Sequence, residues 1–184
     1  MVLTKTPICN FGEKAKDFNL KSTENKQISL KDARGKNGTL VMFICNHCPY
    51  VKAIIKDLVN DVKYLESLGV NSVGIMSNDI KNYPDDSFEN MISFSKLNKF
   101  SFPYLIDETQ NVAKEYGAVC TPDFFGYNKN LELQYRGRIR ELKDLKPVIK
   151  GDSDLKIAMK LVAETGNGPK NQIPSMGCNI KWFK

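Results

Sequence analysis

The fold is decided by residues 39–50, which read Thr39-Leu-Val-Met-Phe-Ile-Cys45-Asn-His-Cys48-Pro-Tyr50. Residues 39–44 form an almost continuous apolar run of strand length, which is typical of a central strand buried on both faces. Two cysteines follow, and Pro49 suits the first position of a helix, where its missing N–H costs nothing. The stretch therefore predicts a buried strand, a turn carrying two thiols and a helix, in that order.

The segment after Pro49 continues as an amphipathic helix and then a second strand. Apolar residues recur at helical spacing along one face: Val51, Ile54, Ile55, Leu58, Val62 and Leu65. Gly69 stands where a helix C-terminal cap belongs, and residues 70–76 again have the composition of a strand. Because such crossovers join parallel neighbours, we expect a β-α-β unit.

The rest of the chain predicts further short elements and no internal repeat. They are a hairpin or an extended lead-in over 16–30, a helix over 85–99, a strand over 102–106, a short helix over 109–116, strands over 123–127 and 131–136 with a turn at 128–130, and a last helix over 153–164. Residues 166–177 are rich in Gly, Pro and Asn, so we expect 166–184 to form a loose, extended C-terminal tail. The order predicts one α/β domain over 1–184, with a central mixed sheet, helices on both faces and an N-terminal extension.

The composition gives no sign of a nucleic-acid or membrane partner. Hydrophobic residues make up 41% and charged residues 26% of the chain, which is ordinary for a globular protein. The net charge is +6, and the surplus lies in residues 129–184, but the basic residues there are spread out and not interleaved with aromatic ones. No apolar run approaches the roughly 18 residues of a membrane span, and the N-terminus does not resemble a secretion signal. We expect a cytoplasmic protein.

The cysteines point to redox chemistry instead of a structural disulfide framework. The chain has five, an odd number, and two of them form a C-x-x-C between the predicted strand and helix. A helix N-terminus carries unpaired N–H groups and a partial positive charge, so a sulfur there ionises more easily, and the thiolate is the attacking species. Two intervening residues let the sulfurs of Cys45 and Cys48 approach disulfide distance.

Position favours Cys48 as the attacking sulfur. With Pro49 at the first helical position, Cys48 is the N-cap residue, whereas Cys45 lies in the loop leaving the strand and becomes its partner. His47, the only histidine, directly precedes Cys48 and would stabilise a neighbouring thiolate when protonated. The alternative for His47 is an exposed loop residue without a role.

Six stretches of the sequence resemble a known family. Residues 11–20 and 28–32 look like the opening of the alkyl hydroperoxide reductase/thiol-specific antioxidant superfamily, and residues 102–107 are similar to peroxiredoxins. Residues 44–52, 120–123 and 177–182 together resemble peroxiredoxin-like thioredoxin-fold proteins with a C-x-x-C. The resemblance covers nearly the whole chain and implies a thioredoxin-like fold with Cys48 at the peroxidatic position.

The resemblance also implies supporting residues near the cysteine pair. In thioredoxin-like folds a cis proline lies opposite the C-x-x-C and exposes backbone that can pair with substrate, which points to Thr121 and Pro122. Cys120 would then lie near the site, either as a third redox thiol or as a packed small side chain, with packing favoured. Cys178 would resolve a disulfide if the tail folds back.

Other residues are expected to have no role in the chemistry. Cys9 is interpreted as an idle thiol, and an idle thiol is also the alternative for Cys178. Arg136 and Arg138 are interpreted as surface charges, although they would lower a thiolate pKa if they pointed at the site.

One departure from the family favours disulfide exchange over peroxide reduction. Peroxiredoxins place a proline seven residues and a threonine or serine three residues before the peroxidatic cysteine, to orient the peroxide. In this chain Val41 and Cys45 stand at those positions.

The sequence thus predicts a thiol–disulfide oxidoreductase that uses a Cys45/Cys48 couple. Its alternatives are a thiol peroxidase with Cys48 as the peroxidatic cysteine, and a non-enzymatic carrier of a soft metal ion on Cys45, Cys48 and His47. The expected partners are a protein or small-molecule disulfide and a reductant such as a thioredoxin or glutathione system. We expect no cofactor and no resident metal.

Overall fold

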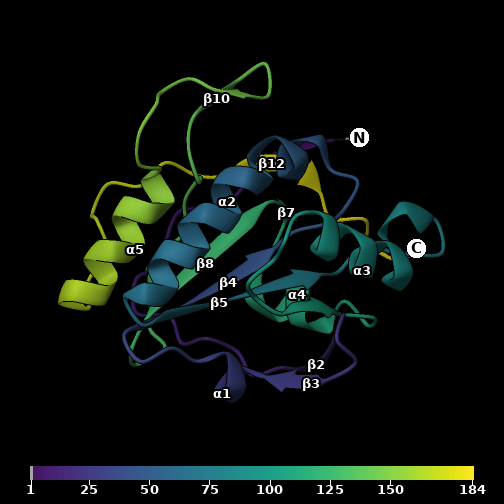
Figure 1. Cartoon of the computed structure of the whole chain (residues 1–184), viewed down its shortest axis with the longest axis horizontal. Helices are drawn as coiled ribbons and strands as arrows, with labels where there is room; N and C mark the ends of the chain where they lie inside the picture. Colours follow the sequence, from purple (N-terminus) through teal and green to yellow (C-terminus); the bar gives the residue numbers. More distant parts are fainter. Residues whose placement is uncertain (1) are drawn as a thin grey trace.

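The computed structural model describes residues 2–184, in which strands and helices alternate along much of the chain (Figure 1). In chain order the elements are β1 (Leu3–Lys5), β2 (Asn19–Ser22), β3 (Gln27–Ser29), α1 (Leu30–Ala33), β4 (Gly38–Phe43), α2 (Pro49–Ser67), β5 (Val70–Met76), the 3-10 turn η1 (Pro84–Asp86), α3 (Phe88–Leu97), β6 (Tyr104–Ile106), α4 (Asn111–Tyr116), β7 (Cys120–Thr121), β8 (Asp123–Asn128), β9 (Leu133–Tyr135), β10 (Leu142–Lys143), β11 (Lys146–Pro147), α5 (Asp154–Thr165) and β12 (Met176–Asn179).

A seven-stranded mixed sheet forms the centre, in the order β3-β2-β6-β5-β4-β8-β9. The strands β4, β5 and β6 are parallel to one another, whereas β8 pairs antiparallel with β4 and β2 pairs antiparallel with β6. The predicted β-α-β unit is therefore confirmed as β4, α2 and β5. A second, smaller sheet has the order β1-β12-β7.

Helices cover both faces of the large sheet, as predicted. Successive side chains of a strand point to opposite faces, and β4 divides accordingly: Leu40 and Met42 join a cluster with α2 and α5, whereas Val41 and Phe43 join one with α1 and α4. Figure 1 shows α2 and α5 lying side by side on the first face, and the two helices are in contact. All four of these β4 side chains are fully buried, which accounts for the continuous apolar run.

The long helix α2 begins and ends where the sequence predicts. Cys48 is its N-cap residue and Pro49 its first residue. Gly69 follows the C-cap with a φ of 77°, in the left-handed region that favours glycine. The helix therefore starts at the carboxyl end of the central strand, with a cysteine at that junction.

Two predicted segments differ in the structure. The helix predicted over 85–99 is divided into η1 and α3, because the Ser87 side chain accepts a hydrogen bond from the Asn90 amide and so starts α3 three residues later. The loose tail predicted within 166–184 is wrong for β12, which pairs with β1 on one edge and β7 on the other. Local composition missed this because both partner strands are far away in sequence.

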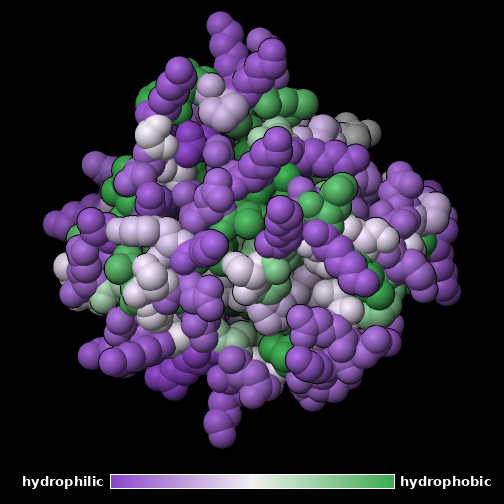
Figure 2. All heavy atoms as spheres, in the orientation of Figure 1, coloured by the Kyte–Doolittle hydropathy of each residue, from purple (hydrophilic) through white to green (hydrophobic). Residues whose placement is uncertain are grey.

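The face of the molecule seen in Figure 2 is largely hydrophilic, with scattered hydrophobic areas. Within residues 2–184, every helix is too short or too polar to cross a bilayer. Arg140, in the basic C-terminal part, is paired with Asp57 of α2 at 3.0 Å.

Candidate active site

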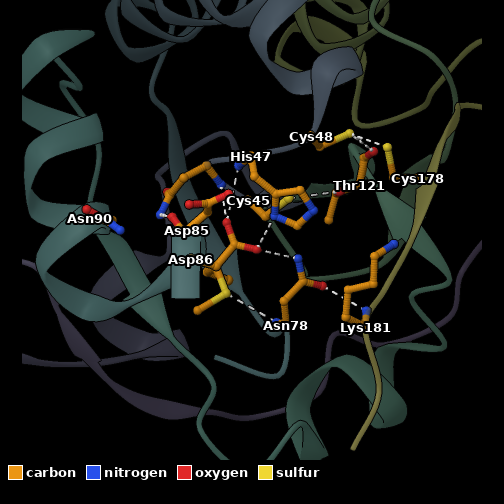
Figure 3. Close-up of polar contacts among 12 residues, drawn as sticks. Cys45, His47, Cys48, Asn78, Asp85, Asp86, Asn90, Thr121, Cys178 and Lys181 are labelled. Carbon is orange, nitrogen blue, oxygen red and sulfur yellow. Dashed lines mark hydrogen bonds and ion pairs between the residues drawn. The ribbon is translucent and has the colours of Figure 1, made fainter. Parts of the chain in front are cut away.

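Three segments that are far apart in sequence meet at the start of α2, and two of them bring three cysteine sulfurs together (Figure 3). Cys45 and Cys48 come from the loop between β4 and α2, Thr121 from β7, and Cys178 from β12. The Thr121–Pro122 peptide bond is cis, as the resemblance implies. All three sulfur-bearing side chains are buried, with exposed fractions of 2% or less.

Cys48 has sulfur and oxygen neighbours, so its burial is not purely apolar. Its Sγ lies 2.9 Å from the Sγ of Cys178 and 3.2 Å from the carbonyl oxygen of Thr121. The Thr121 hydroxyl contacts the other cysteine of the pair, with its Oγ1 3.3 Å from the Sγ of Cys45. Thr121 therefore touches both members of the C-x-x-C.

Hydrogen bonding makes Cys48 the acidic thiol. A hydrogen bond from the Cys45 thiol stabilises the thiolate and, against the opposing effect of burial, lowers the pKa of Cys48 to about 5. Cys178 donates a second hydrogen bond, and the Val51 amide at the helix N-terminus acts in the same direction. The Cys48 side chain makes no capping hydrogen bond at the start of α2. The Val51 amide therefore affects the pKa of Cys48 chiefly as a nearby dipole. These contacts therefore favour the thiolate form of Cys48.

The two neighbouring thiols stay protonated. Burial raises the pKa of Cys45 well above its usual value, and its hydrogen bond to Cys48 raises it further. Burial also raises the pKa of Cys178 to about 12, again with a contribution from the hydrogen bond to Cys48. Cys48 is thus the most acidic of the three thiols that meet at this site.

A buried carboxylate fixes the loop between the two cysteines. Asp86 is fully buried, and one of its oxygens accepts hydrogen bonds from the backbone amides of Asn46 at 2.8 Å and His47 at 3.2 Å. The other oxygen lies 2.6 Å from Nδ1 of His47 and accepts from the Asn78 side chain at 2.7 Å. Burial alone would raise the pKa of Asp86, but the hydrogen bonds from His47 and Asn78 outweigh it and lower the pKa.

His47 is held by Asp86, so it is not a freely exposed loop residue. The hydrogen bond to Asp86 raises the pKa of His47, and the charge of the nearby Cys48 raises it further. A protonated His47 is consequently favoured beside the thiolate. The ring also stacks on Tyr83, with centroids 5.9 Å apart.

A buried ion pair supports the segment after Pro122. Arg136 lies 3.0 Å from the Asp123 carboxylate and donates to the Gly117 carbonyl oxygen at 2.8 Å. The expectation that Arg136 is a surface charge is wrong, because it compensates a fully buried carboxylate. Arg138 is half-buried and bound to Asp154 at 2.7 Å.

The other two cysteines lie outside the sulfur cluster. Cys120 is fully buried on β7, with its Sγ 3.6 Å from the Pro122 carbonyl oxygen, and burial raises its pKa. This arrangement agrees with the favoured interpretation as a packed side chain. Cys9 is half-buried, and burial raises its pKa to about 11.

Sequence reasoning missed Asp86 and Asn78, which orient the loop. Asp86 was assigned to a predicted helix, and it lies about 40 residues from the loop that it holds. Tyr104 also reaches this loop and donates to the Asn46 side chain at 2.9 Å. No local pattern marks such residues, since only the sheet brings the loops after β4 and β5 together.

The group of side chains that comes nearest to a possible metal-binding arrangement is not the predicted set of Cys45, Cys48 and His47. Ligand atoms of Cys45, His47 and Asp86 lie within 4.8 Å of one another, and Cys48 is not part of this group. The hydrogen bond between His47 and Asp86 already accounts for the approach of two of these three. This geometry supports a hydrogen-bonded loop more than a carrier site on Cys45, Cys48 and His47.

A groove lies next to Pro122, between the start of α2 and the segment around β10. Its volume is about 490 Å³, within the usual range of small-molecule sites. The groove has apolar surface from Tyr50, Pro122 and Met176. It also has positively charged groups from Arg138 and Arg140. The cysteines of the sulfur cluster do not line this groove, and its charge is mixed because Glu141 and Asp144 also line it.

These features define a thioredoxin-fold protein with an acidic cysteine at a helix N-terminus. The chain belongs to the AhpC/TSA family, whose model matches residues 11–142. Family membership indicates an enzyme of thiol chemistry, of the oxidoreductase or peroxidase type.

Solved structures are similar over the whole chain. An uncharacterized conserved protein from Geobacillus kaustophilus is 37% identical with a TM-score of 0.94, covering 100% of this chain and 97% of that one. The hypothetical protein SMc02350 from Sinorhizobium meliloti 1021 is 34% identical with a TM-score of 0.90, covering 98% of both chains. A thiol:disulfide interchange protein from Chlorobium tepidum TLS is 18% identical with a TM-score of 0.63, covering 83% of this chain and 97% of that one, and shows the shared fold. No curated protein matches the sequence.

Proposed function

We propose that the chain is a thiol–disulfide oxidoreductase whose nucleophile is Cys48 and whose resolving thiol is Cys45. The observation that carries the proposal is the Cys48 sulfur at the start of α2, with its pKa lowered to about 5 by a hydrogen bond from Cys45. The neighbour that stabilises the thiolate is also the one placed to complete the exchange.

The reaction has two steps. The Cys48 thiolate attacks one sulfur of a substrate disulfide, forming a mixed disulfide and releasing one substrate thiolate, which takes up a proton. Cys45 then loses its proton, attacks the Sγ of Cys48 and releases the second substrate thiol. An external reductant such as a thioredoxin or glutathione system restores both thiols.

A second candidate is a thiol peroxidase, which the family match favours. In that reaction peroxide oxidises Cys48 to a sulfenic acid, which condenses with a neighbouring thiol and releases water. Against it, the Thr121 hydroxyl lies beside Cys45, and Cys45 itself stands where a peroxide-orienting hydroxyl is expected. These contacts support disulfide exchange as the main activity.

Activity assays on cysteine variants test the proposal. Reduction of glutathione disulfide and consumption of hydrogen peroxide are measured for the wild type, Cys48→Ser and Cys45→Ser, with Cys9→Ser as the matched control. We expect Cys48→Ser to lose about 1,000-fold or more of the disulfide activity, since no other thiolate is available, and Cys9→Ser to lose none. Full activity in Cys48→Ser would refute the proposal, and faster turnover of peroxide than of disulfide would favour the second candidate.

A further inference from the structure

The exchange proposed above needs a group that takes the proton of Cys45. Cys45 attacks only as a thiolate, yet burial and the hydrogen bond to Cys48 hold its pKa well above the usual value. Its side chain is only 1% exposed, so solvent does not reach the thiol directly. The proton acceptor therefore has to be a neighbouring side chain.

His47 is the neighbour placed for this transfer. A ring nitrogen of His47, an oxygen of Asp86 and the Sγ of Cys45 lie within 4.8 Å of one another, a separation that one bridging water or a small movement would close. The imidazole extends from the Asp86 carboxylate towards the sulfur cluster (Figure 3). The His47 side chain is 15% exposed, whereas Cys45 and Asp86 are buried. His47 therefore connects the buried thiol with solvent.

The carboxylate of Asp86 is a poor acceptor for this proton. One of its oxygens accepts from the amides of Asn46 and His47, and the other contacts the His47 ring and the Asn78 side chain. The lone pairs of the carboxylate are thus already used. Burial opposes the ionisation of Asp86, but these hydrogen bonds outweigh it and lower the pKa.

The two hydroxyl groups near Cys45 are also poor acceptors. The Thr121 hydroxyl, whose Oγ1 lies 3.3 Å from the Cys45 sulfur, is neutral and only a very weak base. Burial raises the pKa of Tyr104 well above its usual value, so this phenol stays protonated. Among these neighbours the imidazole is the one group that can gain and lose a proton near neutral pH.

Asp86 fixes which ring nitrogen exchanges the proton. Its contact with Nδ1 at 2.6 Å keeps that nitrogen protonated, so Nε2 is the nitrogen that loses and regains a proton. Charged and titratable groups face the ring from three segments: Cys45 and Cys48 in the loop before α2, Tyr83 and Asp86 at η1, and Lys181 after β12.

The charge of Cys48 couples the ring to the first step of the exchange. The hydrogen bond to Asp86 raises the pKa of His47, and the charge of the Cys48 thiolate raises it further. Once Cys48 is part of a mixed disulfide, its charge is gone and that contribution disappears. His47 therefore gives up its proton more easily after the attack than before it.

We infer that His47 is a catalytic proton carrier of the exchange and that Asp86 is its positioning residue. The inference rests on the proposed function, in which Cys48 attacks and Cys45 resolves. It assigns His47 a proton transfer, which is a different role from stabilising the Cys48 thiolate by charge.

The two steps balance with one carrier. In the first, Cys48 bonds to one substrate sulfur, and His47 gives its proton to the departing substrate thiolate. In the second, the neutral ring takes the proton of Cys45, whose sulfur then bonds to that of Cys48 and releases the second substrate thiolate. One external disulfide is reduced to two thiols, two cysteines are oxidised to one disulfide, and His47 returns to its protonated form.

A disulfide with a coloured thiolate separates the two steps in a stopped-flow experiment. Dithiobis(nitrobenzoate) releases one nitrothiobenzoate when Cys48 attacks and a second when Cys45 resolves. Every protein compared carries Cys9→Ser and Cys178→Ser, so that neither the half-buried thiol nor the thiol in contact with Cys48 contributes to the second phase. This double variant is the background for the changes at His47 and Asp86.

His47→Gln is expected to slow the second phase about 100-fold at about pH 7 and to change the first phase less than about threefold. The first phase is little affected because nitrothiobenzoate leaves without a proton donor. Asp86→Asn should act in the same direction, since an amide that donates to Nδ1 places the proton of the neutral ring on Nε2. Asp85→Asn, which changes an exposed carboxylate in the same turn, is the matched control and should leave both phases unchanged.

The pH profile distinguishes proton transfer from a structural effect. In the background protein the second phase should level off once His47 is neutral. In His47→Gln it should keep rising about tenfold per pH unit up to about pH 9, because hydroxide then has to remove the proton of Cys45.

The ring can also be followed without changing His47 or Asp86. His47 is the only histidine of the chain, so the imidazole nitrogen NMR signals of the untagged protein belong to it. In the background protein with Cys45→Ser added, the pKa of His47 should fall when Cys48 is converted into its mixed disulfide with glutathione. An unchanged pKa would overturn the inference.

The outcomes separate the inference from the proposed function. A second phase of equal rate and pH dependence in His47→Gln would overturn the role of His47 and leave Cys48 and Cys45 in theirs. Equal slowing of both phases would tie His47 to the nucleophile and also count against the inference. A background protein with a single phase would overturn Cys45 as the resolving thiol, and with it the proposed function.

Discussion

At the scale of single residues, the reactivity assigned to Cys48 depends on hydrogen bonds more than on a nearby cation. Burial opposes its ionisation, and the hydrogen bonds from Cys45 and Cys178 reverse that effect. Asp86 acts one step further away, since it holds the backbone of Asn46 and His47 and so the geometry of the turn. The acidity of one thiol is therefore a property of the whole loop.

The rate of alkylation of Cys48 is expected to follow a pKa near 5. Because that pKa is depressed, the thiolate is present above about pH 6, and the rate falls about tenfold per pH unit below 5 as the thiol protonates. Cys45→Ala removes the main hydrogen-bond donor and should move the midpoint upward. The measurement is the rate of iodoacetamide labelling against pH, followed by peptide mass spectrometry.

Cys9 provides a control within the same sample. Its pKa is raised to about 11, so its labelling should still increase with pH up to that value. A midpoint near 9 for Cys48 would contradict the assignment of the nucleophile.

At the scale of elements, the site lies where α2 begins and where β12 covers it. Cys48 has no exposed surface, and Cys178 on β12 is one of the groups against it. Access to the thiolate therefore requires the strand or a neighbouring segment to open. At Gly177 a Cβ would lie 2.1 Å from the Thr121 carbonyl oxygen, which makes this position the point at which to test the opening.

Gly177→Ala is expected to expose Cys48. The added methyl group would lie 2.1 Å from the Thr121 carbonyl oxygen, so β12 should shift away from β7. We expect labelling of Cys48 at pH 7 to rise about tenfold, with a loss of about 1–3 kcal/mol in the free energy of unfolding. Met176→Ala, on the same strand with a partly exposed side chain, is the matched control and should change the labelling rate little. Unchanged labelling in Gly177→Ala would show that β12 does not limit access.

At the scale of the whole molecule, the sulfur cluster connects the two ends of the fold. Cys48 and Cys178 are 130 residues apart in sequence, and β12 also pairs with β1 near the N-terminus. A bond between these cysteines would close most of the chain into a loop. Oxidation should consequently change the stability of the molecule and not only its reactivity.

The Cys48–Cys178 disulfide is expected to stabilise the fold. In the chain-entropy model a loop of this length contributes about 4–5 kcal/mol to the free energy of unfolding, relative to the reduced form. The test compares denaturant unfolding of Cys45→Ser before and after oxidation with glutathione disulfide. Cys45→Ser/Cys178→Ser should show no such gain, and an equal gain in both variants would assign the effect to another bond.

The sequence by itself determined the central strand, the capped helix and the cysteine pair between them. These are local features: apolar runs, helical spacing and a proline after a cysteine act over a few residues, so they can be recognised in the chain. The place of Cys48 at the helix N-cap followed from them, and the thioredoxin-like fold followed from the family resemblance; both are confirmed.

Only the tertiary structure decided which groups surround the cysteine pair. Asp86 is about 40 residues from the turn that it holds, and Cys178 is 130 residues from the sulfur that it contacts. Residues 166–177 have the composition of a loose tail, yet β12 begins within them at Met176, because two distant strands supply its hydrogen bonds. Contacts across such separations depend on how the sheets assemble. Local composition does not predict which distant strands will pair.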